Sequence, residues 1–344
     1  MLGINQMHND LYFGEIINSF HHEMVSLEFS SPVKGWLSEV VVKTEDLQED
    51  RAEYTKGVNR IQQTTDGGKT WRMIYESPRT LIKQLHYMNG TNELWGVKSV
   101  YQKGQFRPHF MLYKSPDEGV HWDKVCELPV PYAIDGFTFF DEPHGYVWTL
   151  TKIFATSTGG KQWQLLTPAI NPPSNEELIN PIGPDQFMYF ITRQIQEVKG
   201  INPWKKQELN LELPDLFEPQ NVLADPAHPT VYVIGQIAAQ WQLLGYEQEQ
   251  LSSQETVPIR ERDFMIDVFA YGDNVINLVG LTTRSFLSSY YFYVRDVNGW
   301  HKEHPSGKKG FEHMVYWGNH AWAIRIALLK GYRELWRRRL PALE

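Results

Sequence analysis

Cysteine is almost absent from this sequence of 344 residues, and long apolar runs are absent altogether. The single cysteine, Cys126, excludes an internal disulfide framework and a cysteine-based zinc site. No apolar stretch approaches the roughly 18 residues that a membrane-spanning helix requires. The first 20 residues lack the basic and apolar regions of a secretory signal. The sequence leaves open whether the protein is exported (periplasmic or secreted) or cytoplasmic.

An excess of positive charge is also missing. Lys and Arg number 33 against 41 Asp and Glu, which gives a formal net charge of −8. Nucleic-acid binding requires a concentrated basic surface, so we do not expect a nucleic-acid partner. The sequence has no phosphate-binding loop, dinucleotide fingerprint or serine elbow. The histidines of "HKEH" (301–304) and "HH" (21–22) fit a polar loop and strand alternation better than metal ligation, so we predict neither a metal nor a cofactor.

Strand and turn residues are abundant. Segments rich in Val, Ile, Tyr, Phe and Trp alternate with turns that carry Gly, Pro, Asn and Asp, and no long segment has the 3.6-residue period of a helix. The length fits either two ordinary domains or one large all-β domain. We therefore predict an all-β chain in which helix is nearly absent.

An eight-residue motif, called the octet below, occurs three times in the first half of the chain. It reads "TTDGGKTW" from Thr64, "SPDEGVHW" from Ser115 and "TSTGGKQW" from Thr156, and the starts are 51 and 41 residues apart. Asp side chains can accept hydrogen bonds from backbone N–H groups of their own turn, and Gly permits positive φ. The octet therefore predicts a tight turn between a third and a fourth strand, whose Trp folds back as an apolar anchor.

A longer pattern of strand, short turn and strand occurs seven times. Aligned at the start of each second strand, the units are 58, 52, 41, 44, 44 and 46 residues apart. The aligned residues are Trp36, Leu94, Tyr146, Phe187, Val231, Val275 and Ala321. Four short strands in about 40–50 residues make one propeller blade. We predict a seven-bladed β-propeller, with a six-bladed propeller and an irregular pair of β-sandwiches as alternatives.

A single propeller domain of this kind spans residues 1–344. The last unit ends after its third strand, in "YRELWRRRL", so its outer strand is missing. The segment Asp10–Ile17 has strand composition and precedes the first unit. We predict that residues 1–20 supply the closing strand of the last blade, because its edge would otherwise be unpaired.

The octets carry a resemblance to a known repeat. Their pattern, Ser/Thr-x-Asp-x-Gly-x-x-Trp, resembles the Asp-box, or BNR repeat, of sialidases, xyloglucanase-type glycosidases, sortilin-like receptors and the photosystem II assembly-factor family. The third copy departs from the pattern because Thr158 replaces the Asp. In those families the box lies at the periphery, away from the ligand face, which implies a structural role here. The matching residues are Thr64, Asp66, Gly68, Trp71, Ser115, Asp117, Gly119, Trp122, Gly160 and Trp163.

Function follows from this resemblance only in outline. Sialidases hold the substrate carboxylate with three arginines, the first near the chain start, but the first 50 residues here contain no Arg. This absence and the degenerate later boxes favour a non-enzymatic propeller, closest in style to the photosystem II assembly factors. We expect it to bind a protein or another macromolecule as an assembly, accessory or inhibitory factor. The alternatives are an exported receptor-like module and a divergent carbohydrate-active enzyme, since glycoside hydrolysis needs only two suitably spaced carboxylates.

Candidate binding residues fall in the loops between blades and between second and third strands. Five arginines from five units lie in or beside such loops, and Arg forms forked hydrogen bonds with the carboxylates of a partner. Aromatic residues and Arg are also typical of interface hot spots. The predicted binding residues are Arg79, Tyr101, Arg107, His109, Arg193, Arg260 and Arg284. The acidic insertion Lys43–Gly57 is predicted to be a solvated surface loop, with a partner-binding loop as the alternative.

Overall fold

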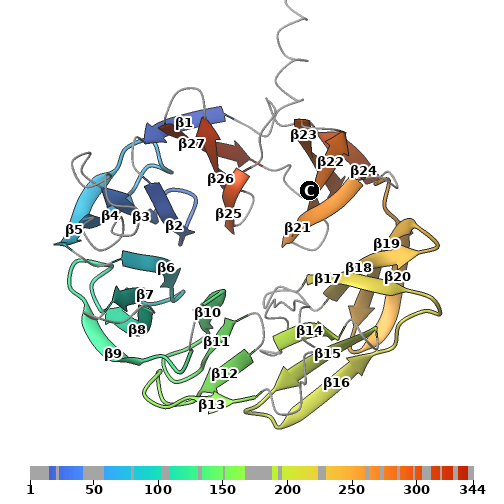
Figure 1. The fold of residues 1–344 in the computed structure, drawn as a ribbon, viewed down its shortest axis with the longest axis horizontal. Coiled ribbons are helices and arrows are strands. Elements are labelled where there is room, and N and C mark those ends of the chain that lie inside the picture. Colours follow the sequence, from blue (N-terminus) through green and yellow to red (C-terminus); the bar gives the residue numbers. More distant parts are fainter. Residues whose placement is uncertain are drawn as a thin grey trace, which may run out of the picture. The chain divides into compact units, whose positions relative to one another are not determined.

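A computed structural model shows that the chain is built from β-strands. In the part of the chain that it describes there is no helix, so the all-β prediction is confirmed (Figure 1). None of the described segments is therefore a helix able to cross a membrane. The described residues are 15–20, 23–41, 58–78, 81–101, 108–130, 134–149, 152–166, 188–192, 196–223, 230–259, 263–271, 275–284, 287–296, 299–303, 311–317, 320–327 and 332–339.

The described strands form seven antiparallel sheets, six with four strands and one with three. The chain divides into two compact units. The larger unit comprises residues 15–169 and 311–338, and the smaller unit comprises residues 1–14, 170–310 and 339–344. Four sheets belong to the larger unit and three to the smaller one.

In the larger unit, three of the four sheets are antiparallel meanders. Three sheets consist of consecutive strands, β2 to β5, β6 to β9 and β10 to β13, and the fourth has the order β1-β27-β26-β25. Their bounds are β1 Glu15–Phe20, β2 Glu23–Phe29, β3 Gly35–Val41, β4 Val58–Thr64, β5 Arg72–Pro78, β6 Leu81–Tyr87, β7 Leu94–Tyr101, β8 Pro108–Ser115, β9 Asp123–Glu127, β10 Gly136–Phe139, β11 Gly145–Thr149, β12 Lys152–Thr156, β13 Gln164–Leu165, β25 Phe311–Trp317, β26 His320–Ala327 and β27 Tyr332–Arg339.

The fourth sheet of the larger unit brings together strands from the two ends of the sequence. β1 runs antiparallel to β27, with Glu15 opposite Arg337 and Phe20 opposite Arg333, and it forms one edge of the sheet. This pairing gives β27 a neighbour on both sides, which removes an exposed strand edge. Most of the segment 10–17 that the sequence analysis singled out lies outside the described residues, which begin at residue 15.

The smaller unit contains the only three-stranded sheet of the described chain, β14-β15-β16, together with the sheets β17 to β20 and β21 to β24. The bounds are β14 Met188–Thr192, β15 Glu197–Asn202, β16 Gln207–Leu211, β17 Glu218–Leu223, β18 Thr230–Ile237, β19 Gln240–Glu247, β20 Gln250–Thr256, β21 Asp263–Tyr271, β22 Val275–Arg284, β23 Leu287–Asp296 and β24 Gly299–Glu303.

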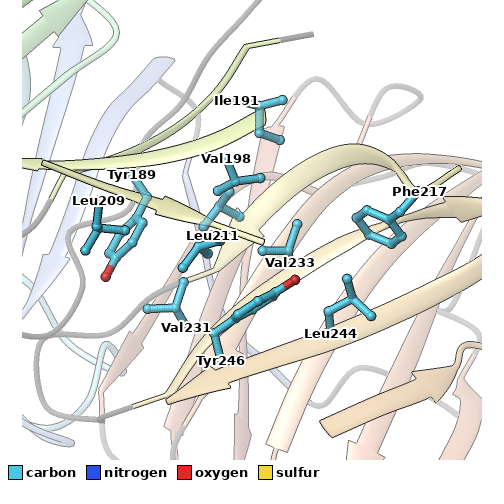
Figure 2. Packing of buried hydrophobic residues seen from close by; sticks show 11 residues of the cluster. Tyr189, Ile191, Val198, Leu209, Leu211, Phe217, Val231, Val233, Leu244 and Tyr246 are labelled. Atoms are coloured by element: carbon cyan, nitrogen blue, oxygen red, sulfur yellow. The ribbon is translucent and has the colours of Figure 1, made fainter. Parts of the chain in front are cut away.

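A mainly aliphatic core holds the first two sheets of the smaller unit together (Figure 2). Val, Leu and Ile side chains from β14 to β19 pack around the rings of Tyr189, Phe217 and Tyr246. Polar contacts also join the sheets of this unit. The Tyr246 hydroxyl donates to the Glu212 carbonyl at 2.8 Å, and Arg295 of β23 donates from two nitrogens to the carboxylate of Glu255 in β20.

A bulge recurs at the same place in the first strand of five sheets. The register of pairing with the second strand shifts across one residue there, which is the signature of a β-bulge. The shifts lie between Met24 and Ser26, Ile82 and Gln84, Pro219 and Asn221, Met265 and Asp267, and Phe311 and His313. The same irregularity in both units indicates that the sheets are copies of one structural repeat.

Candidate functional site

The first octet forms a closed turn between β4 and β5. The Thr64 hydroxyl accepts the N–H of Gly68 at 2.9 Å and donates to Asp66 Oδ1 at 2.9 Å. Asp66 in turn accepts the N–H of Thr70 at 2.9 Å and its hydroxyl at 2.6 Å. These hydrogen bonds, first those from Thr70, lower the pKa of Asp66 to about 2. The indole N–H of Trp71 donates to the Gly68 carbonyl at 2.8 Å. The octet thus satisfies its own polar groups.

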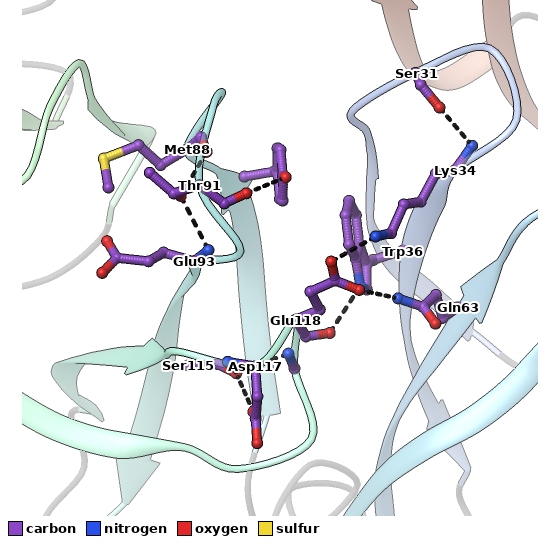
Figure 3. Close-up of polar contacts among 12 residues, drawn as sticks. Ser31, Lys34, Trp36, Gln63, Met88, Thr91, Glu93, Ser115, Asp117 and Glu118 are labelled. Atoms are coloured by element: carbon purple, nitrogen blue, oxygen red, sulfur yellow. Dashed lines mark hydrogen bonds and ion pairs between the residues drawn. The ribbon is translucent and has the colours of Figure 1, made fainter.

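The second octet repeats these bonds between β8 and β9, with Ser115 and Asp117 in the roles of Thr64 and Asp66. It differs at Glu118, which has a φ of 61° where the other two octets have glycine. Glu118 Oε1 lies 2.5 Å from Lys34 Nζ, and its Oε2 accepts from Gln63 at 3.1 Å (Figure 3). These contacts reach the sheet β2 to β5, so the cost of a positive φ at Glu118 is offset by a link between two sheets.

The third octet, between β12 and β13, shows what the loss of the Asp changes. The Thr158 hydroxyl accepts the N–H of Gln162 at 2.9 Å, which is the bond that Asp makes in the other copies. A hydroxyl has one oxygen where a carboxylate has two, so the second bond to the side chain at this position is lost. The indole of Trp163 donates to Cys126 Sγ at 3.5 Å instead of to a glycine carbonyl.

Stacked aromatic pairs join the four sheets of the larger unit. Each pair sets an indole from a second strand against a ring from the end of the next sheet's first strand. The three pairs are Trp322 with Phe29, Trp36 with Tyr87, and Trp95 with Phe139, with ring centroids 3.7, 4.8 and 4.0 Å apart and interplanar angles of 9°, 17° and 15°. All three indoles are at most 1% exposed. Such stacking adds to the burial of a large apolar area.

Two of the octets also accept hydrogen bonds from second-strand indoles. Trp322 donates to the Gly67 carbonyl at 3.1 Å, and Trp36 donates to the Glu118 carbonyl at 2.8 Å. Within the described residues, the indole N–H of Trp95 has no partner. The sequence alignment on Leu94 and Ala321 was therefore displaced by one residue, because Trp95 and Trp322 occupy the position of Trp36. The octet Trp residues are half-buried: Trp71 meets Phe29 edge-on at 6.3 Å.

A row of polar side chains on β2, β6 and β10 is the candidate functional site. We call it the first-strand row and define it as Ser26, Glu28, Gln84, His86 and Thr138. Each of these side chains except Thr138 forms a hydrogen bond with the backbone of the neighbouring sheet. The bonded group lies in the first strand of that sheet or in the residue that precedes this strand. Ser26 Oγ accepts the Leu85 N–H at 3.0 Å, and Glu28 Oε1 accepts the Tyr87 N–H at 3.1 Å. Gln84 donates to the Asp135 carbonyl at 3.0 Å.

Glu28 and His86 form the ionisable centre of the first-strand row. His86 Nε2 lies 2.9 Å from the Phe139 carbonyl, which can only accept, so Nε2 carries a proton. His86 Nδ1 faces Glu28 Oε1 at 3.8 Å, and the two side chains are 22% and 23% exposed. The imidazole also meets the ring of Phe137 edge-on at 6.0 Å. The pair is enclosed by the protein but reachable by solvent.

Burial shifts the pKa values of this pair in opposite directions. It raises the pKa of Glu28 to about 7, against the smaller lowering effect of the Tyr87 N–H. It lowers the pKa of His86, which the bond to the Phe139 carbonyl only partly opposes. Both shifts follow from the cost of charge in a poorly solvated place. The pair can therefore take up or release a proton near neutral pH, although it contains one carboxylate and not two.

Sequence reasoning missed the first-strand row. Its signal is the alternation in "SLEF", "QLHY" and "FTF", where polar residues alternate with apolar ones and so share one face of a strand. In the sequence these stretches indicate only where each unit begins, because alternation alone does not distinguish a solvated face from a functional one.

Most of the predicted binding residues lie outside what the structure describes. Arg79, Arg107, Arg193 and Arg260 fall in undescribed segments, as does the insertion Lys43–Gly57. Tyr101 ends β7 and Arg284 ends β22, but the structure describes neither side chain. His109 on β8 is described: its Nδ1 lies 2.5 Å from Glu127 Oε1 on β9, within the same sheet. The convergence of the five arginines stays a prediction.

Among the described residues, no group of three or more His, Cys, Asp or Glu side chains is arranged to hold a metal ion. His301 lies in β24, and the other three histidines of the two motifs, His21, His22 and His304, lie outside the described residues.

Comparison with solved structures identifies the fold. No protein-family model matches the sequence, and no curated protein sequence matches it either. YCF48 from Cyanidioschyzon merolae is similar over 94% of this chain and 96% of its own, with a TM-score of 0.58 and 11% identity. The β-propeller domain of the trilobed protease from Pyrococcus furiosus is similar over 96% of this chain and 97% of its own, with a TM-score of 0.57 and 9% identity.

A third similar structure is an enzyme. The xyloglucanase from Xanthomonas campestris matches 96% of this chain and 56% of its own, with a TM-score of 0.54 and 11% identity. At these identities the likeness concerns the fold, which is that of a β-propeller. The described strands, arranged as repeated antiparallel meanders, agree with this assignment.

Proposed function

We propose that this protein is a non-catalytic β-propeller that binds a protein partner as an assembly, accessory or inhibitory factor. In this proposal the seven sheets are the seven blades of one domain spanning residues 1–344, and β1 is the closing strand of the last blade. The octets are Asp-boxes whose residues have a structural role.

One observation carries the functional proposal. The chain and YCF48 match over 94% and 96% of their lengths, whereas the xyloglucanase is matched over only 56% of its length. The shared fold thus accounts for almost the whole length of this chain and of YCF48, whereas the xyloglucanase has a large further part that this chain does not match. A fold does not by itself confer chemistry, so we favour binding over hydrolysis.

The geometry of the octets supports their structural role. Asp66 and Asp117 use their carboxylate oxygens on groups of their own turns, Thr70 and His121. A carboxylate that is engaged in this way, with its pKa lowered to about 2, is poorly suited to donate or accept a proton in catalysis.

The composition of the first-strand row also favours binding over glycoside hydrolysis. Hydrolysis by the common mechanisms requires an acid and a second carboxylate about 5–10 Å apart, and the row contains Glu28 alone. Its other members donate and accept hydrogen bonds. They can orient the polar groups of a bound chain without reacting with it.

The partner is proposed to contact the loops that carry the predicted arginines, with Tyr101 and His109 beside them. A protein of net charge −8 that gathers five guanidinium groups on one face would recognise the carboxylates of an acidic partner. A carbohydrate is the other ligand class that such loops could hold.

Affinity capture of the tagged chain from its own cells tests the proposal. We expect a stoichiometric protein partner whose affinity for the purified chain falls at high salt. Arg107→Glu and Arg284→Glu should weaken this binding at least tenfold without lowering the melting temperature. Arg60→Glu is the matched control, because Arg60 pairs with Glu76 at 2.7 Å on the third and fourth strands of a sheet.

A screen with chromogenic glycosides and sialosides tests the carbohydrate-active alternative. Turnover that a single carboxylate substitution abolishes would replace the binding proposal with an enzymatic one. If neither arginine substitution changes the affinity for the partner, the proposed contact surface is wrong.

A further inference from the structure

A leucine protrudes from the smaller unit at the turn "PDLF", residues 214–217. Leu216 is 81% exposed, whereas the other exposed large apolar side chains of the described chain are at most 53% exposed. The next residue, Phe217, is only 2% exposed and packs in the core of the unit. The turn therefore sends one large side chain inward and the adjacent one into solvent. Single exposed leucines are common, so exposure alone would mean little.

The backbone at Leu216 supplies a second observation. The Phe217 N–H donates to the Pro214 carbonyl at 3.1 Å, which closes a four-residue turn. Leu216, the third residue of this turn, has a φ of 62°. That position favours Gly or Asn, because a branched side chain is strained in the left-handed region. Six other non-glycine residues in the described part of the smaller unit have positive φ, but Leu216 is the only one of the seven with a large apolar side chain. A leucine here neither adds to the core nor suits the turn, and a local conflict of this kind points to a functional role.

The turn is held firmly on both sides. Before it, the Glu212 carbonyl accepts the Tyr246 hydroxyl at 2.8 Å, and Pro214 has a fixed φ. After it, the ring of Phe217 lies over Gly235, where an added Cβ would come within 2.6 Å of the ring. A side chain on so constrained a base loses little freedom on binding, which favours its use as an anchor.

The charged residues that flank Leu216 in the sequence are of one sign. Glu212, Asp215 and Glu218 are all exposed within four residues of it. The stretch from Gln207 to Leu223 contains four acidic residues and no Lys or Arg. An apolar knob in an acidic setting is complementary to an apolar pocket with a basic rim.

We propose that Leu216 is the anchor of a protein interface and inserts into an apolar pocket of a partner that is rimmed by Lys and Arg. This inference deepens the proposed protein-binding function and rests on it. It adds a contact that is separate from the predicted arginine loops, and it specifies the partner's surface: apolar at the centre and basic at the edge. Large apolar residues at the centre of an interface commonly dominate its affinity.

Site-specific photo-crosslinking in the full chain is the first test. A benzoylphenylalanine is placed at position 216, and at position 251 as a control. Leu251 is the other exposed leucine in the described part of the smaller unit, 44% exposed on β20. After irradiation in the protein's own cells, we expect one protein to be linked from 216 and not from 251. Its linked peptide should lie beside Lys or Arg residues.

The purified partner and Leu216→Gly give the second test. Glycine accepts the positive φ, so the variant should melt about 2 °C higher than the parent. Its affinity for the partner should nonetheless fall at least tenfold, because the anchor is gone. Leu216→Met restores an apolar side chain and should bind within threefold of the parent. Leu251→Thr should bind as the parent does, and Asp215→Lys should weaken binding.

A rise in stability together with a loss of affinity is the result that a merely structural leucine cannot give. If Leu216→Gly binds the captured partner as well as the parent does, this inference is wrong while the proposed function stands. A crosslink to a second copy of this chain, with association seen in sedimentation, would replace the partner with self-assembly. If capture and crosslinking both yield no protein, the proposed function and the inference fail together.

Discussion

The two units reach the same kind of sheet by different turn chemistry. In the described part of the larger unit, positive φ falls on six glycines and on Glu118. In that of the smaller unit it falls on Gly299 and on seven other residues, among them the adjacent pairs Ala238–Ala239 and Gln248–Glu249. Both pairs are two-residue hairpin turns with positive φ at each residue, where Asn-Gly is usually favoured.

The contacts between sheets differ in the same way. In the larger unit, neighbouring sheets are joined by stacked aromatic rings, by hydrogen bonds from indoles to octet carbonyl groups, and by the ion pair of Glu118 with Lys34. The first two sheets of the smaller unit share an aliphatic core, and its last two are linked by Arg295 and Glu255. A repeated fold thus constrains the strand order, and it leaves the turns and the contacts between sheets open to more than one solution. The following changes test this difference.

The largest effect is expected at the stacked indoles. Trp36→Ala should lower the free energy of unfolding by about 3–5 kcal/mol, because it empties a buried site and removes the stack on Tyr87. Denaturant unfolding measures the loss, and hydrogen exchange locates it. We expect protection to fall in β3 and β6 and to persist in β18 and β19. Trp71→Ala, at a half-buried ring, should cost less; an equal cost would show that the octet ring and not the stack holds the sheets.

The Glu28–His86 pair should make stability depend on pH. The folded pKa of Glu28, about 7, is above its unfolded value of 4.5, so folding binds a proton and stability falls as pH rises from about 4.5 to 7. The loss is on the order of 2 kcal/mol after allowance for partial exposure. The His86 pKa is lowered, so its contribution is lost as pH falls below 6.5.

Glu28→Gln isolates the carboxyl in this pH dependence. The amide oxygen can still accept the Tyr87 N–H, so the variant should be the more stable protein at pH 8 and equal to the parent near pH 4. Thermal melts across this range measure it, with the exposed Glu127→Gln as control. A variant that is less stable than the parent at pH 8 would show that the ionised carboxylate stabilises the fold, and would contradict the raised pKa of Glu28.

Removing the Asp from one octet and restoring it in another should change stability in opposite directions. Asp66→Ala should cost about 1–2 kcal/mol, since the N–H and hydroxyl of Thr70 lose their acceptor. Thr158→Asp should stabilise the third octet by about 0.5–1 kcal/mol by restoring a second acceptor oxygen. Denaturant midpoints of both variants give the comparison. Thr158→Ser is the control, and a Thr158→Asp protein no more stable than it would show that the third turn gains nothing from a carboxylate.

The smallest effect is expected in the hairpin turns of the smaller unit. Replacing Ala238–Ala239 with Asn-Gly should raise stability by about 0.5–1 kcal/mol, because these residues accept the positive φ that alanine adopts at a cost. The same replacement at Gln248–Glu249 should act alike. Calorimetry measures both. Destabilisation by either would contradict the turn geometry on which the comparison of the two units is based.

Several features of the fold were readable from residues. The alternation of apolar and turn residues predicts an all-β chain, and the structure confirms it in the described part. The octets have side chains of defined hydrogen-bonding capacity at fixed spacing, so their place between third and fourth strands was recognisable. The hairpin turns of the smaller unit were harder to predict, because Ala-Ala and Gln-Glu are not residue pairs that favour positive φ.

The sequence by itself determined the strand-rich repeat and the octet turns, because both depend on the periodicity and hydrogen bonding of neighbouring residues. Only the tertiary structure decided which residues of different sheets meet. It set Trp36 on Tyr87 instead of leaving the octet Trp as the main anchor, and it placed His86 3.8 Å from Glu28. It also left Leu216 in solvent while Phe217 was buried. These contacts join residues whose distance depends on how whole sheets pack and how single turns are oriented, which local sequence does not specify.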